Sequence, residues 1–224
     1  MGKNQRQMPK TTEYLSNPLF WDLVYAYIQV HSEWDGEIGH PRILKKKEVN
    51  FSKIAGELGV TRQTVSKRFA DLSEGQPGKQ GLGLITKLEN GDYEIAILPK
   101  EIATLVSNET LRIMTSACND RTIAAYIYLY SRWCASGQQE FKFTYSQLKK
   151  IIGVKDTTRS NDYIIKDILN VLIKLELLQV RLEADFNDKG GYSNIYCVTD
   201  MGTEIQDSIG ELVIKEKKEA ESKN

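Results

Sequence analysis

Residues 51–68 of the 224-residue chain read FSKIAGELGVTRQTVSKR, and this segment is the most informative about the fold. Its spacing is that of a helix-turn-helix motif, with small Ala55, then Gly59 four residues on, then the β-branched Val65 six residues further. A small residue at position 55 lets two helices cross closely, and a glycine at position 59 accepts the positive φ of a tight turn. Thr61 is the expected N-cap of the second helix.

The second helix of this motif is predicted over residues 62–72. If Val65, Phe69 and Leu72 face the core, the opposite side is exposed near the N-terminal end, which is the part of a recognition helix that reaches base edges in the major groove. Arginine can bond guanine, and glutamine can bond adenine, with two hydrogen bonds each. The predicted base-contacting residues are Arg62, Gln63, Ser66 and Lys67. The predicted phosphate-contacting residues are Thr61, Arg68, Lys53, Lys45, Lys46 and Lys47.

The charge distribution is uneven although the formal net charge is zero. Residues 42–68 hold eight bases and two acids, a local excess of six positive charges, so the rest of the chain carries the opposite excess. One basic region on an acidic body is typical of a phosphate-binding surface. A solvated charged loop is the alternative interpretation of the same pattern.

The sequence around the motif predicts a winged helix. An amphipathic helix is expected from Asn17, with Pro18 at its first position. After the motif, residues 84–88 and 93–98 flank Asn90-Gly91, a strong hairpin signal. Three helices followed by a hairpin is the winged-helix order.

The chain also repeats itself. Residues 26–34 read AYIQVHSEW and residues 125–133 read AYIYLYSRW, with five of nine positions identical. Leu-Gly-Val at 58–60 and Ile-Gly-Val at 152–154 are a second match in the same order. We therefore predict an α+β chain, mainly α, with two tandem winged helix-turn-helix domains related by internal duplication.

This duplication divides the chain into five expected segments. They are a flexible N-terminus at 1–16, a DNA-reading domain at 17–98, a structured helical connector at 99–118, a second domain at 119–200, and a C-terminal helix with a charged tail at 201–224.

The second copy is less basic than the first. Aligning Ile164 with Val65 and Ile168 with Phe69 predicts its second helix over residues 162–178. Residues 149–167 have an excess of only two positive charges, so this domain is expected either to touch DNA or to form a homodimer, the latter through the domain itself or through the C-terminal helix. Its DNA-contact candidates are Arg159, Ser160, Asn161, Tyr163, Lys166 and Lys189.

Two such copies in one chain resemble plasmid and phage replication-initiator proteins. The resemblance covers the architecture of nearly the whole chain, but at residue level only 51–68, a motif that transcription repressors share. It implies a sequence-specific protein that binds double-stranded DNA and belongs to a plasmid, phage or mobile element, acting as replication initiator or transcriptional regulator. The alternative is a protein-protein interaction module that assembles a replication or partition complex without reading sequence.

The motifs of enzymes are missing from the sequence. His31 and His40 are nine residues apart, unlike the paired metal-binding histidines of strand-nicking initiators, and the three cysteines are scattered. We expect no catalysis, metal site or cofactor. No apolar run approaches the roughly 20 residues of a membrane span, so we expect a cytoplasmic protein without membrane contact.

Overall fold

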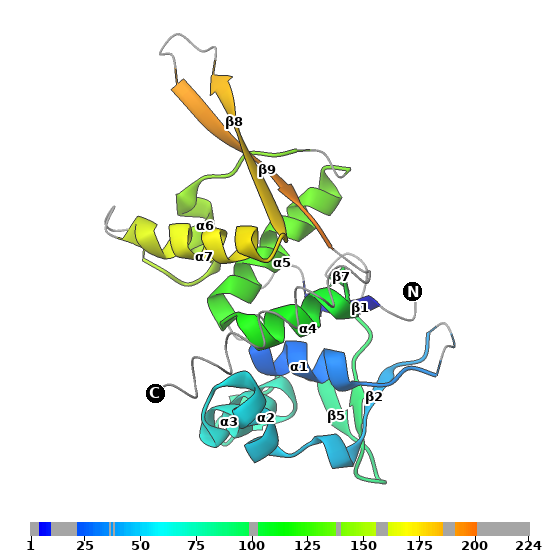
Figure 1. Cartoon of the computed structure of the whole chain (residues 1–224). Helices are drawn as coiled ribbons and strands as arrows, with labels where there is room; N and C mark the ends of the chain where they lie inside the picture. The colour runs from blue at the N-terminus through cyan, green and yellow to red at the C-terminus, as the bar shows by residue number, and fades with distance from the viewer. Residues whose placement is uncertain are drawn as a thin grey trace.

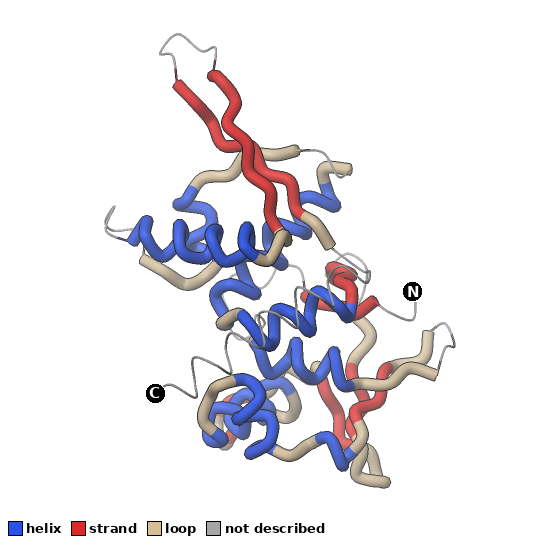
Figure 2. Tube along the Cα trace, in the orientation of Figure 1, coloured by secondary structure: helices blue, strands red, loops and turns tan. Residues whose placement is uncertain are grey.

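The chain is a mixed α+β protein whose described residues form seven α-helices and small antiparallel sheets (Figures 1 and 2). The computed structural model describes residues 5–9, 22–35, 37, 39–98, 103–137, 140–155, 161–185 and 191–200. We refer to residues 22–98 as the first unit and to residues 120–200 as the second unit.

The first unit begins with a buried helix and ends with a sheet. Its three-stranded antiparallel sheet has the order β2-β6-β5, with the β5–β6 hairpin closed through the turn at Asn90-Gly91. A second, minor hairpin joins β3 to β4. The elements are α1 (Leu23–His31), β2 (Arg42–Leu44), η2 (Lys46–Glu48), α2 (Phe51–Leu58), α3 (Arg62–Leu72), β3 (Gly75–Gln76), β4 (Lys79–Gln80), β5 (Ile85–Lys87) and β6 (Tyr93–Ile95).

Local sequence explains the helix pair α2–α3. Asn50 caps α2, because its side chain accepts hydrogen bonds from the backbone N–H groups of Ser52 and Lys53, both at 3.1 Å. Gly59 ends the helix in the left-handed region with φ 64°, as the motif predicted. The N–H of Val60 then bonds the carbonyl of Ala55 at 3.0 Å, which turns the chain into α3. The pair packs against α1, in which every residue from 23 to 30 is buried.

The second unit repeats the order of three helices followed by a hairpin, but among its described residues a single bridge stands in place of β2 and there is no counterpart of the β3–β4 hairpin. The bridge between Phe141 and Tyr196 corresponds to the pairing of β2 with β6. Gly153, with φ 68°, follows α6 as Gly59 follows α2. The β8–β9 hairpin is much longer than β5–β6 and projects away from the helices (Figure 1). The elements are α5 (Asp120–Ala135), α6 (Tyr145–Ile151), α7 (Asp162–Lys174), β8 (Leu178–Asp185) and β9 (Gly191–Val198).

The structure shifts the predicted alignment of α7 with α3 by one residue. Val65 and Phe69 are buried in α3, and the residues buried at the same spacing in α7 are Ile165 and Leu169, while Ile164 is only half-buried. The sequence alone does not decide which side of α7 is buried, because the helix carries two adjacent apolar stripes and only packing in the core selects between them. These stripes are formed by Ile164, Ile165, Ile168 and Leu169. The helix also ends at Lys174, before the predicted residue 178.

The N-terminus and the connector differ from expectation. Residues 5–9, inside the segment expected to be flexible, form strand β1 (Gln5–Pro9), which pairs antiparallel with β7 (Ala103–Ser107). The connector expected to be helical is therefore β7 followed by α4 (Asn108–Ala117), which packs beside α1. Burial of Met8 and Val106 favours this pairing, and Arg6 Nε donates to the carbonyl of Gln29 at 2.7 Å. The predicted C-terminal helix and tail at 201–224 lie outside the described residues.

Candidate nucleic-acid interface

Four polar side chains cover one face of α3. Arg62, Gln63, Ser66 and Lys67 are all exposed and, together with Ala70, line a shallow depression in the surface. These four residues are the predicted base-contacting set, and the structure brings them together. We refer to them as the outer face of α3.

The opposite side of α3 holds the helix in place. Val65 and Leu72 are fully buried and Phe69 nearly so, and the ring of Phe69 meets that of Tyr93 edge-on at 5.1 Å. Thr61 is the N-cap, because its Oγ1 accepts the N–H of Thr64 at 3.1 Å. The outer face is therefore presented by a helix that is fixed at its start and along its inner side.

The outer face is positively charged. In the part of the chain that the structure describes, neither Arg62 nor Lys67 forms an ion pair, and Arg62 is the first residue of α3, where the helix dipole adds partial positive charge. Carboxylates near α2 compensate Lys53, one of the other predicted cations. Lys53 Nζ lies 3.9 Å from Glu48 and 3.8 Å from Glu57.

The lysines at 45–47 lie next to the turn of the β5–β6 hairpin. Lys45 Nζ is 3.4 Å from Asp92 Oδ2, and the backbone N–H of Lys46 donates to Asp92 Oδ1 at 2.9 Å. That backbone hydrogen bond is the main cause that lowers the pKa of Asp92, and Lys45 adds to it. The Lys46 side chain runs so close to Gly91 that an added Cβ there would lie 3.1 Å from its Cδ. Lys46 and Lys47 are exposed, so this cluster remains available to an anion.

Arg68 points away from the outer face. Its Nε lies 3.4 Å from Asp22 Oδ2 and its Nη2 lies 3.6 Å from Asp120 Oδ2. At about 100° per residue, Arg68 is roughly opposite the centre of the outer face. The geometry therefore does not support our expectation that Arg68 contacts phosphate, and gives it instead a role between the two units.

The predicted contacts of the second unit are only partly described. Arg159, Ser160 and Lys189 lie outside the described residues. Asn161 donates from Nδ2 to the carbonyl of Lys155 at 2.9 Å, within the turn before α7. Tyr163, 60% exposed, and the exposed Lys166 lie on the outer side of α7.

A buried ion pair replaces the small residue of the helix crossing in the second unit. Lys149 occupies the place of Ala55, its side chain is only 4% exposed, and its Nζ lies 2.7 Å from Asp162 Oδ1. Asp162 stands in the first turn of α7, and because it is paired with Lys149 this end of the helix gains no net positive charge that would attract a phosphate backbone. The N-terminal end of α7 is thus less suited to DNA than that of α3.

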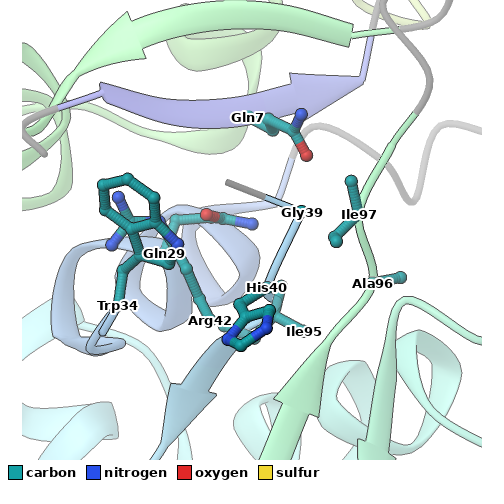
Figure 3. Close-up of a pocket in the computed structure, with 9 residues that line it drawn as sticks. All are labelled: Gln7, Gln29, Trp34, Gly39, His40, Arg42, Ile95, Ala96 and Ile97. Atoms are coloured by element: carbon teal, nitrogen blue, oxygen red, sulfur yellow. The ribbon is translucent and has the colours of Figure 1, made fainter. Parts of the chain in front are cut away.

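A small cavity near β1 was not foreseen from the sequence (Figure 3). It measures about 60 Å³ and opens between Gln7, Gln29, Trp34 and Ile97, with His40 and Arg42 at its base in the view. The buried Oε1 of Gln29 has no hydrogen-bond partner among the described protein atoms. A cavity of this volume can hold a few water molecules, which could satisfy that oxygen, but it has no room for a nucleotide.

Two further observations concern other classes of site. Among the described residues, no group of histidine, cysteine or carboxylate side chains is arranged to hold a metal ion. In the same part of the chain, no helix combines the length and apolarity needed to cross a membrane.

Comparison of the chain with protein-family models, curated proteins and solved structures finds no match.

Proposed function

We propose that this chain is a sequence-specific double-stranded DNA-binding protein built from two winged helix-turn-helix domains related by duplication. The matching element order of the two units and the glycine turns at positions 59 and 153 support the architecture. In this proposal α3 is the recognition helix and the β5–β6 hairpin is the wing. The chain acts as replication initiator or transcriptional regulator of a plasmid, phage or other mobile element.

The observation that carries the proposal is the outer face of α3. An exposed Arg62-Gln63 pair at the start of a recognition helix offers hydrogen bonds that discriminate guanine and adenine in the major groove. Lys46 and Lys47 are exposed in the same unit, beside the turn of the β5–β6 hairpin, and supply contacts to phosphate that carry no sequence information. Together they provide one element for reading bases and another for binding the backbone.

Selection of binding sites from a random duplex library tests this function. The intact protein is expected to enrich one sequence, while a protein with Arg62→Ala and Gln63→Ala enriches none, although its salt-dependent binding to random DNA persists. Thermal unfolding of both proteins checks that the exposed substitutions leave the fold intact. If the intact protein enriches no sequence at moderate salt, the proposal of sequence-specific binding is wrong.

A second role, contact with another protein subunit, is favoured for the second unit. Asp162 reduces the positive potential at the start of α7, and Tyr163 and Ile173 leave apolar surface exposed along the same helix. We infer that this helix contributes to a homodimer rather than to base reading. Sedimentation of the intact chain with and without Tyr163→Asp tests the inference, because a charge at the centre of an interface should shift a dimer toward monomer.

A further inference from the structure

A charged contact joins the inner side of α3 to the starts of two other helices. Arg68 lies within 3.6 Å of both Asp22, the N-cap of α1, and Asp120, the first residue of α5. Asp22 Oδ1 accepts the N–H of Val24 at 2.6 Å, and Asp120 Oδ1 accepts the N–H of Leu23 at 2.9 Å. The two units therefore meet at the back of the helix that presents the outer face. We refer to Asp22, Arg68 and Asp120 as the latch.

The latch contains more negative than positive charge. Among the described residues, the charged groups that act on Asp22 are Asp120 of α5 and Arg68 and Asp71 of α3. Asp22 is 3% exposed, and burial, followed by repulsion from Asp120, raises the pKa of Asp22 to about 7. The attraction of Arg68 and the hydrogen bond from Val24 oppose this change. Asp22 is thus able to exchange a proton near neutral pH.

We propose that the latch couples DNA binding on the outer face of α3 to the contact between the two units, and that protonation of Asp22 tightens both. The proposal rests on the DNA-binding function proposed above. A neutral Asp22 no longer repels Asp120, so Arg68 and Asp120 hold the start of α5 more firmly against α3. If α3 is held in place in this way, it loses less conformational entropy when it binds in the major groove of DNA.

Electrostatic repulsion between DNA and the latch also favours the protonated form of Asp22. A duplex on the outer face brings phosphate charge toward α3 and disfavours an additional carboxylate behind the helix. Binding therefore favours the protonated form of Asp22, and by linkage the protonated form binds DNA more tightly. The expected consequence is that affinity for DNA rises as the pH falls through 7.

The experiment measures fluorescence anisotropy of a random-sequence 30-base-pair duplex with the intact chain, between pH 6 and pH 8 at constant ionic strength. A change of one unit in the pKa of Asp22 on binding gives roughly a tenfold change in affinity, so we expect roughly three- to tenfold tighter binding at pH 6 than at pH 8. Asp22→Asn keeps an acceptor for the N–H of Val24 but cannot ionise. The Asp22→Asn variant retains both histidines, His31 and His40. Only the part of the pH dependence of affinity that is due to Asp22 should therefore disappear.

Two more variants distinguish the latch from a merely structural contact. Asp120→Asn removes a negative neighbour, lowers the pKa of Asp22, and should move the midpoint of the affinity profile to lower pH. Arg68→Met removes the positive neighbour and should move it to higher pH. If these residues had only a structural role, each substitution would weaken binding equally at every pH and leave the midpoint unchanged. Thermal unfolding at each pH reports whether a variant is folded.

The outcomes separate the two proposals. If the intact chain binds no duplex at any pH, the proposed function is wrong. If it binds, but the affinity of the wild type and of Asp22→Asn varies identically with pH, the latch is overturned and the DNA-binding function stands. Opposite midpoint shifts for Asp120→Asn and Arg68→Met support the latch, and an unchanged midpoint in both contradicts it.

Discussion

Helices α3 and α7 hold the same position in the order of elements but present different surfaces. The first carries Arg62 and Lys67 without carboxylate partners among the described residues, over a crossing made by small Ala55. The second carries Asp162 in its first turn, tied to a buried lysine at that crossing. One scaffold can therefore keep the spacing of its core residues while the charge on its outer surface changes. This difference is also the reason that we assign DNA reading to only one of the two helices.

The largest expected change in unfolding free energy comes from placing a lysine, as found at the α6–α7 crossing, into the α2–α3 crossing. Ala55→Lys places a charged side chain at a helix crossing that has no carboxylate at the position equivalent to Asp162. The substitution should therefore lower the unfolding free energy by roughly 3 kcal/mol or more. Urea denaturation measures the loss. Gly56→Lys is the matched control, because this neighbouring position is exposed and has no atom within 4 Å of an added Cβ. If Gly56→Lys destabilises the protein as much as Ala55→Lys, the tight crossing is not the cause.

The opposite replacement sharpens the same comparison. Lys149→Met removes the buried charge but keeps most of the volume. It leaves Asp162 without its partner, and the loss of one partner is costly only where the remaining charge is buried away from water. Because Asp162 remains 35% exposed at the side chain, water can solvate it after the substitution. We expect a change within about 1 kcal/mol in unfolding free energy. A loss as large as that of Ala55→Lys would contradict this account of the pair.

The next prediction compares one cation on each helix. Arg62→Ala should weaken binding to the selected DNA site by roughly 1–3 kcal/mol and relax the base preference at the position it contacts. Lys166→Ala, at an exposed position of α7, should change affinity far less. Anisotropy titrations against selected and random duplexes measure both. Equal losses on the two duplexes for Arg62→Ala would show that it binds phosphate rather than a base.

A further prediction concerns stability and pH. The pKa of Asp22 is raised from 3.8 to about 7 in the folded protein, so the folded state binds a proton that the unfolded state releases. The stability this proton provides is complete below pH 4 and is lost as the pH rises to about 7. In urea denaturation, the unfolding free energy of the Asp22→Asn protein should therefore fall less steeply between pH 4 and pH 7 than that of the wild type. Parallel curves for the two proteins would mean that Asp22 does not hold its proton in the folded state.

The smallest expected effect is on the wing side of the first unit. Lys47→Ala should weaken binding about equally on all DNA sequences and reduce the slope of log affinity against log salt concentration by about one. Titrations at several salt concentrations measure this slope. A loss confined to the selected site would instead give Lys47 a role in reading sequence.

Local signals predicted much of the first unit. Gly59, Thr61 and the turn at Asn90-Gly91 act through the backbone conformation of their own neighbours, so their positions in the sequence placed α2, α3 and the hairpin directly. The same local reasoning brought the outer face of α3 together, because its members share one side of one helix.

The features that the sequence did not reveal depend on distant partners. Helical spacing already directs Arg68 away from the outer face, but its partner Asp120 lies in another unit, and no local pattern links these two residues. The pairing of β1 with β7 joins segments about a hundred residues apart, and neither strand has a periodic pattern long enough to predict it. The phase of α7 required the packed core, since two apolar stripes compete within it.

The pairing of β1 with β7 also determines the order in which the chain can fold as it is made. Gln5 finds its partner only at Ser107, so the first strand has to wait until the ribosome has released residues 103–107. Helices α1 to α3 can form earlier, because their contacts are closer in sequence. Strand β1 is therefore synthesised about a hundred residues before the strand with which it pairs. A fragment that stops before residue 103 leaves it without a partner, and a stalled or prematurely terminated chain of that length would expose the strand to aggregation.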